Sequence, residues 1–151
     1  MIKKLFLCSF IFLLLISCGY QPIYSSSKKI NFMIYDFKVS GETTTKNFFK
    51  ENLEKYSNDK QELKYFLDIK SSYDKIELTK NAAGKVIDYK LILKVNIKIK
   101  SNQMNKQFNM TEDFVIKNDT DDFEENRYEE TIKLELASKI LNKLILQISN
   151  L

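Results

Sequence analysis

The chain has 151 residues and a formal net charge of +4, with no histidine, two cysteines, three glycines and one proline. This length suits one domain with one core, and the commonest general base and metal ligand is missing. So small a net charge gives no basis for predicting a nucleic-acid partner.

Residues 1–17 have the organisation of a bacterial export signal. Lys3 and Lys4 precede an uncharged, mostly apolar run from Leu5 to Ser17. A transmembrane helix needs about 20 apolar residues to cross the hydrocarbon core, and this run ends sooner. We therefore expect residues 1–17 to be a signal peptide that is removed.

The end of this run resembles the lipobox of bacterial lipoproteins. Leu15-Ile16-Ser17-Cys18 presents an aliphatic residue, a tolerant position, a small residue and a cysteine. The pattern predicts that Cys18 is the lipidation site, and several acyl chains anchor a protein stably to a membrane. An ordinary secretory signal with a chance cysteine is the alternative. Residues 18–29 would form a lipidated tether, and Gly19, which is not acidic, favours the outer membrane over inner-membrane retention.

Hydrophobic periodicity predicts the first elements of a domain over residues 30–151. Ile30 to Val39 is β-branched and aromatic and begins apolar on both faces, which indicates a strand buried by neighbours. Gly41 to Thr44 is a break with capping residues, and Thr45 to Tyr56 has helical spacing. Residues 63–70 then alternate as a strand with one wet face would.

Further elements follow in the second half of the chain. A turn at Asn81 to Gly84 precedes the clearest strand, in which apolar residues alternate with polar ones over residues 90–100. A second turn at Ser101 to Gln103 leads to a strand marked by Phe108 to Ile116. The last element is a helix from about Phe123 to Ser149, with a capping pattern just before it.

The final helix carries one apolar stripe, formed by Leu136, Ala137, Ile140, Leu141, Leu144 and Ile148. Such a stripe is typical of a helix packed on a sheet. A helix lying on a bilayer surface is the alternative, but surface-seeking helices tend to be strongly basic. Here the polar side carries both signs, in Glu135, Lys139 and Lys143, and we therefore predict core packing.

The element order β-α-β-β-β-α predicts an α+β sandwich. Two helices are expected to pack on one face of a four-stranded, mainly antiparallel sheet. The other sheet face would be polar and would meet water or a partner.

Residues that could carry catalysis are few, and we predict that the chain is not an enzyme and binds no cofactor. No Gly-rich phosphate loop or Gly-x-Ser-x-Gly motif occurs, and lipidation would consume the thiol of Cys18. Carboxylates cluster at Asp119, Asp121, Asp122, Glu124 and Glu125. They could bind calcium, but EF-hand spacing is absent, and acidic residues are favoured at a helix N-terminus in any case.

The segment Cys18-Gly19-Tyr20-Gln21-Pro22-Ile23-Tyr24 resembles the mature N-terminus of the LPS-assembly lipoproteins, the LptE family, in its alphaproteobacterial form. The hairpin over residues 81–93 is similar to a hairpin of that family. Residues 136–144 are similar to its terminal helix. The order of elements agrees over residues 18–151.

The resemblance implies an outer-membrane lipoprotein with its domain on the periplasmic side or within a barrel lumen. Such a protein plugs and helps to assemble the LPS-translocating β-barrel, an LptD-like protein, and binds lipopolysaccharide during its insertion at the cell surface. Two alternatives stay open. One is an accessory lipoprotein of another envelope assembly or secretion machine that binds only protein, and the other is a small surface lipoprotein with no machine attached.

The resemblance also suggests a ligand surface for lipopolysaccharide. The family carries a basic residue just before the turn of this hairpin, where Lys80 stands in this chain. Lys85, Lys90 and Lys94 continue the positive stretch from the turn along the next strand. The alternative is a solvated lysine face that only protects the sheet from aggregation.

Overall fold

The structure is a computed structural model that describes residues 32–57, 63–118 and 121–151. The predicted signal peptide, Cys18 and the tether lie outside the described residues. The elements in chain order are β1 (Phe32–Ser40), α2 (Thr43–Leu53), the short 3₁₀ helix η2 (Glu54–Tyr56), β2 (Leu63–Lys80), β3 (Val86–Lys100), β4 (Asn105–Lys117) and α3 (Asp122–Ile148). The predicted order β-α-β-β-β-α is confirmed.

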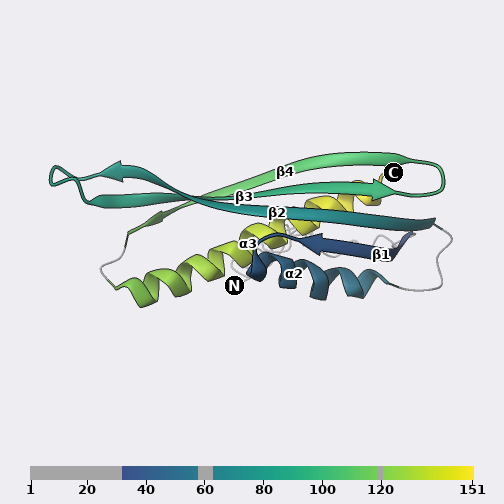
Figure 1. Ribbon diagram of the computed structural model, residues 1–151, viewed down its shortest axis with the longest axis horizontal. Coiled ribbons are helices and arrows are strands. Elements are labelled where there is room, and N and C mark those ends of the chain that lie inside the picture. The colour runs from purple at the N-terminus through teal and green to yellow at the C-terminus, as the bar shows by residue number, and fades with distance from the viewer. Residues whose placement is uncertain (1–31, 58–62, 119–120) are drawn as a thin grey trace, which may run out of the picture.

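The four strands form one sheet in the order β1-β2-β3-β4 (Figure 1). Strands β2, β3 and β4 are joined by antiparallel hairpins, whereas β1 pairs with β2 in parallel. A parallel pair needs a crossover connection, and α2 provides it. The predicted mainly antiparallel sheet is therefore confirmed, with one parallel pair at the β1 edge.

Strand β1 is an edge strand, although its sequence suggested burial by neighbours. Its first three residues, Phe32, Met33 and Ile34, are buried, and Tyr35 then stands exposed. The pairing with β2 shifts register between Ile34 and Asp36. This bulge interrupts the alternation that a regular edge strand would show.

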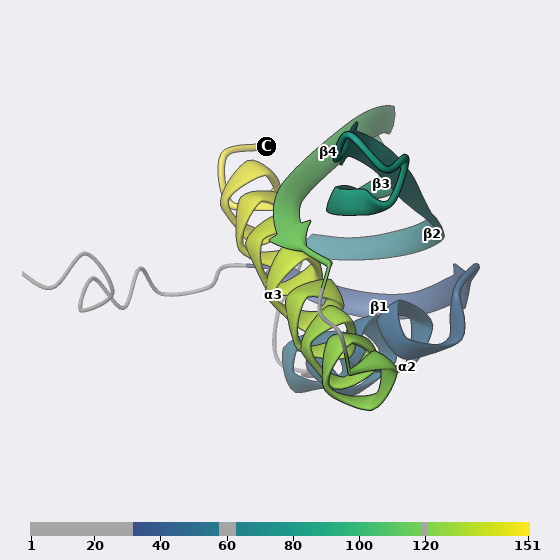
Figure 2. The same ribbon diagram turned by 90° about the vertical axis from the view of Figure 1, so that its left-hand side faces the viewer.

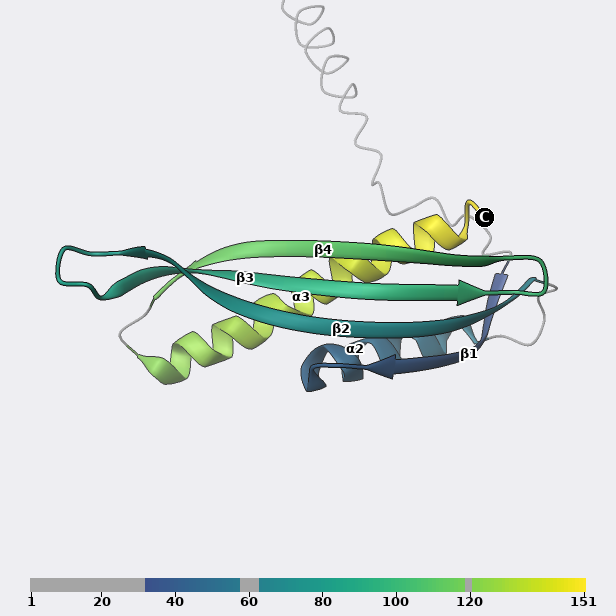
Figure 3. The same ribbon diagram turned by 45° about the horizontal axis from the view of Figure 1, so that its top comes forward.

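Both helices pack on the same side of the twisted sheet (Figures 2 and 3). The alternating apolar residues of β3 supply the centre of the core: Leu91, Leu93, Val95, Ile97 and Ile99. The predicted stripe of α3 faces them, and all six of its residues are buried. Core packing of the final helix is thereby confirmed.

The two helices begin where the sequence places capping residues. Glu42 precedes α2 and accepts hydrogen bonds from the backbone N–H groups of Thr44 and Thr45 at 3.0 and 2.9 Å. Asp121 precedes α3 and accepts from the N–H of Phe123 at 2.9 Å. These contacts satisfy donors that a helix N-terminus leaves unpaired.

The β2–β3 hairpin is longer than predicted and extends past the start of α3 as an arm (Figure 1). Two register shifts, between Glu77 and Lys80, increase its twist. Ile76, Leu78 and Ile87 stand about half exposed on this arm. None of the helices in the described part of the chain combines the length and apolar character needed to cross a membrane.

Candidate functional site

The sheet surface opposite the helices, which we call the open face, is the candidate binding surface. Its central column comes from β3, where Lys90, Ile92, Lys94, Asn96, Lys98 and Lys100 alternate with the core residues. Register places Ser72 and Thr111 on either side of Lys94. Polar residues from three strands therefore share one surface, as the alternation predicted.

Two of the predicted ligand lysines lie at the hairpin end of the arm. Lys80 ends β2, and its ammonium group lies 2.8 Å from the carboxylate of Glu77, which raises the pKa of Lys80. Lys85 lies in the turn, where its backbone N–H donates to the side chain of Asn81 at 2.9 Å. Both lysines are exposed, so an incoming ligand could reach them.

The other two predicted lysines lie on the open face of β3, beyond the register shifts. The Lys90 ammonium group is 3.1 Å from Asp113 on β4. Lys94 donates to Asp74 on β2 at 2.8 Å. Exposed ion pairs of this kind contribute only about 0–1 kcal/mol to the stability of the fold. Each carboxylate nevertheless offsets part of the positive charge that an anionic ligand would meet.

The open face is less uniformly polar than the alternation of β3 predicted. Ile76 on β2 and Val115 on β4 lie on either side of Lys90, and both are 47% exposed. At the other end of the sheet, the rings of Tyr35 and Phe66 meet edge to face at 5.2 Å. These apolar groups belong to β1, β2 and β4. The sequence of β3 alone does not reveal them, because strand register places them beside its lysines on the open face.

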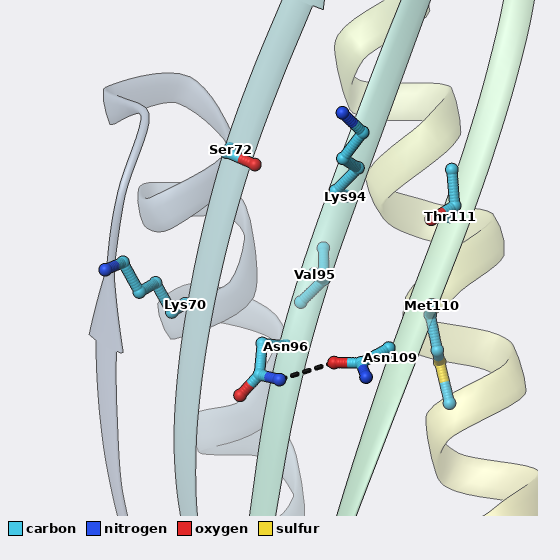
Figure 4. Close-up of a pocket in the computed structure, with 8 residues that line it drawn as sticks. All are labelled: Lys70, Ser72, Lys94, Val95, Asn96, Asn109, Met110 and Thr111. Carbon is cyan, nitrogen blue, oxygen red and sulfur yellow. Dashed lines mark hydrogen bonds between the residues drawn. The ribbon is translucent and has the colours of Figure 1, made fainter.

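The middle of the open face has a shallow hollow of about 280 Å³ (Figure 4). Its lining residues are Lys70, Ser72, Lys94, Val95, Asn96, Asn109, Met110 and Thr111. The Asn96 side-chain amide donates to the side-chain oxygen of Asn109 across β3 and β4. Lys70, Asn96 and Asn109 were not predicted as site residues, because they become neighbours only through strand register.

A second polar group lies on the helix side of the sheet, between β2 and α3. The hydroxyl of Tyr73 donates to Glu129 at 2.7 Å, and Lys75 donates to the same carboxylate at 2.8 Å. Lys75 also donates to Glu125 at 2.7 Å. Lys133 lies 3.5 Å from Glu129, with its ammonium group 4.5 Å from the ring centroid of Tyr73.

The pKa values of this network follow from burial and pairing. Burial alone would raise the pKa of Glu129, but hydrogen bonds from Lys75 and Tyr73 and the charges of Lys75 and Lys133 hold it below its ordinary value. Burial, the hydrogen bond to Glu129 and nearby negative charge raise the pKa of Tyr73 strongly. Lys133 keeps a raised pKa despite burial, because Glu130 and Glu129 outweigh it. The network therefore joins α3 to β2 with Glu129, Lys75 and Lys133 charged and Tyr73 neutral at neutral pH.

The acidic cluster before and within the start of α3 is divided among separate contacts. Asp119 lies outside the described residues, and Asp121 caps the helix. Glu125 pairs with Lys75, and Glu124 lies 3.7 Å from Arg127. Across residues 32–57, 63–118 and 121–151, no group of three or more acidic, histidine or cysteine side chains could hold a metal ion.

The arrangement of helices and strands is known from solved structures. Rare lipoprotein B from Shewanella oneidensis matches 76% of this chain and 97% of its own, with a TM-score of 0.56 and 14% identity. The fold resembles that of rare lipoprotein B. An uncharacterized lipoprotein B from Nitrosomonas europaea matches 81% of this chain and 87% of its own, with a TM-score of 0.50 and 11% identity. No protein-family model and no curated protein sequence matches the chain.

At such low identity, the likeness to rare lipoprotein B concerns the fold and carries no residue roles. The candidate site therefore rests on this chain's own side chains. On the open face these are lysine ammonium groups, amides and hydroxyls, a set that suits binding of an anionic, hydrogen-bonding ligand.

Proposed function

We propose that the chain is an outer-membrane lipoprotein, anchored through Cys18, that binds lipopolysaccharide and plugs and helps to assemble an LptD-like β-barrel. The observation that carries this proposal is the agreement of two independent features. The segment Cys18 to Tyr24 resembles the start of the LPS-assembly lipoproteins, and the domain has a fold resembling that of rare lipoprotein B.

The distribution of polar groups supports a place inside a wet barrel. The interior of a large outer-membrane barrel is polar, and the open face presents lysines and amides to its surroundings. The apolar stripe of α3 is buried against the sheet, so the domain can enter such a lumen with its core intact.

The end of the arm and the open face together support binding of lipopolysaccharide. Phosphate groups accept charge-assisted hydrogen bonds from lysines, and Lys80 and Lys85 at the end of the arm are exposed. Ile76 and Leu78 stand exposed on the same arm and could meet the acyl chains. We propose these lysines, with Lys90 and Lys94, as ligand contacts and propose no catalytic step.

Co-purification tests the proposal. The tagged, lipidated protein is isolated from its own membranes under mild detergent, with an unrelated tagged lipoprotein as control. We expect one large β-barrel protein to accompany it and to be lost from the outer membrane on depletion, with less surface lipopolysaccharide. Recovery of another envelope machine, with normal surface lipopolysaccharide after depletion, would support the accessory-lipoprotein alternative instead.

A further inference from the structure

Several lysines of the open face take part in none of the ion pairs of the described residues. Lys70 on β2 and Lys98 on β3 form no ion pair with any residue that the structure describes. Lys80, Lys90 and Lys94, by contrast, each pair with a carboxylate. Among the described residues, Lys85 is the one lysine of the predicted stretch without an ion pair, so the middle of the sheet carries more unpaired positive charge than that stretch does.

Strand register arranges these lysines around one residue, Asn96. Lys70 lies directly opposite Asn96 on the neighbouring strand, about 4.8 Å away between strands. Lys94 and Lys98 lie two residues before and after Asn96 on β3, about 7 Å along the strand in each direction. All of these residues project from the open face, so the ammonium groups of Lys70 and Lys98 can reach an anion placed over Asn96, and Lys94 can join them by leaving Asp74.

Two acidic residues lie beside this arrangement, Asp74, which pairs with Lys94, and Asp68, and they do not cancel its charge. Asp68 lies opposite Lys98 on β2, but it also lies opposite Lys38 on β1. One carboxylate thus stands between two lysines. The cross-strand rows of residues that contain Lys70, Lys94 and Lys98 therefore have a net positive charge.

The uncharged residues beside these lysines indicate which kind of molecule would carry the anionic group. On the β4 side the hollow is edged by Asn109 and Thr111, and Ser72 lies on the β2 side (Figure 4). Amides and hydroxyls both donate and accept hydrogen bonds, as sugar hydroxyls require of a partner. The hollow is shallow, which suits one or two saccharide units lying flat on the sheet.

We propose that the hollow around Asn96 binds a phosphorylated saccharide, with Lys70, Lys94 and Lys98 on the phosphate and Asn96 and Asn109 on sugar hydroxyls. This site is distinct from the lysines at the end of the arm. The proposal rests on the proposed function only for the choice of saccharide as the carrier of the phosphate.

Binding of a soluble probe to the purified, lipidated protein in neutral detergent tests the site. The probe is a phosphorylated glucosamine disaccharide without acyl chains, and titration calorimetry gives its affinity. We expect Lys70→Gln with Lys98→Gln to weaken binding about tenfold, which corresponds to about 1.4 kcal/mol, at an unchanged thermal midpoint. The matched control is Lys50→Gln with Lys139→Gln on the helices, where we expect less than about a twofold change.

Three results would overturn the proposal. Equal losses from the two lysine pairs would show only a general effect of charge. A larger loss from Lys80→Gln with Lys85→Gln would place the site at the end of the arm. Equal affinity for glycerol phosphate would overturn the saccharide assignment, because a phospholipid headgroup would then serve as well.

The two proposals can fail separately. Disaccharide binding that depends on Lys70 and Lys98, without a co-purified barrel, would support the site and contradict the proposed partner. A co-purified barrel with no disaccharide binding would support the proposed partner and contradict the site.

Discussion

The hydroxyl of Tyr73 on β2 donates a 2.7 Å hydrogen bond to the carboxylate of Glu129 on α3. The Glu129 side chain is only 11% exposed and is held from two further directions by Lys75 and Lys133. Removing one member of a buried network leaves the others without partners, which costs more than the lost contact itself.

We therefore expect Glu129→Gln to lower the free energy of unfolding by about 2 kcal/mol, because breaking a largely buried pair is costly and residual exposure reduces the effect. Chemical denaturation measures this change. The control is Glu124→Gln, which alters an exposed contact with Arg127 and should change stability by less than about 0.5 kcal/mol. Similar losses from both variants would show that the Glu129 contacts are no stronger than surface contacts.

The carboxylate of Glu129 also predicts that the stability of the fold depends on pH. The pKa of Glu129 in the folded protein lies below its ordinary value of 4.5. The stabilisation is thus complete above pH 4.5 and is lost as the pH falls through the folded value. In denaturation at a series of pH values, Glu129→Gln should lose less stability than the wild type below pH 4.5. Parallel curves for the two proteins would contradict the assignment.

Leu93 lies in the centre of the β3 column and is fully buried. Leu93→Ala should cost about 2–5 kcal/mol, and Leu93→Asp should prevent stable folding because it buries an unpaired charge. Leu146 on α3 is exposed, and Leu146→Asp is the matched control. An unchanged thermal midpoint in Leu93→Asp would mean that the core face has been assigned to the wrong side of β3.

Gly41 and Gly84 both have positive φ angles, of 123° and 79°. A Cβ at Gly41 would lie 2.0 Å from the carbonyl oxygen of Ser71, whereas nothing lies within 4 Å at Gly84. Gly84→Ala should cost about 1–2 kcal/mol from backbone strain alone. Gly41→Ala should cost clearly more, because the strand or helix must also shift. Equal midpoints in thermal unfolding would contradict the close approach of Gly41 to β2.

Cys18→Ser should leave a precursor that carries no lipid. The thiol is the group that would accept diacylglycerol, and a hydroxyl does not replace it. Metabolic labelling with a fatty acid decides the result, with Cys8→Ser as the control because Cys8 lies within the predicted signal peptide. Label retained by Cys18→Ser would overturn the cleavage assignment.

The central elements of the fold could be predicted because each satisfies one local rule. Residues 91–99 alternate cleanly, since one face of β3 is buried along its centre. The stripe of α3 is equally regular. The second half of β2 was not predicted, because Lys75 faces the helix in an ion pair while Ile76 and Leu78 stand exposed. In this part of β2, contacts with α3 determine which residues are buried, and the usual alternation of apolar and polar residues is lost.

The candidate site was less accessible to sequence reasoning. The exposure of Lys80, Lys85, Lys90 and Lys94 follows from their positions in a hairpin, but the acidic partners of Lys80, Lys90 and Lys94 do not. Asp113 meets Lys90 only because β4 pairs with β3 in one register. Counting lysines along one strand therefore overstated the free charge of that strand and missed the contribution of Lys70 on another strand.

The parallel ladder between β1 and β2 has a consequence for the order of folding. Phe32 pairs with Leu63 across the whole α2 connection, whereas Lys80 pairs with Val86 across a short turn. Closing a long loop costs more chain entropy than closing a short one, and local pairings form sooner. The β2–β3–β4 meander should thus assemble first and serve as a template onto which β1 docks last.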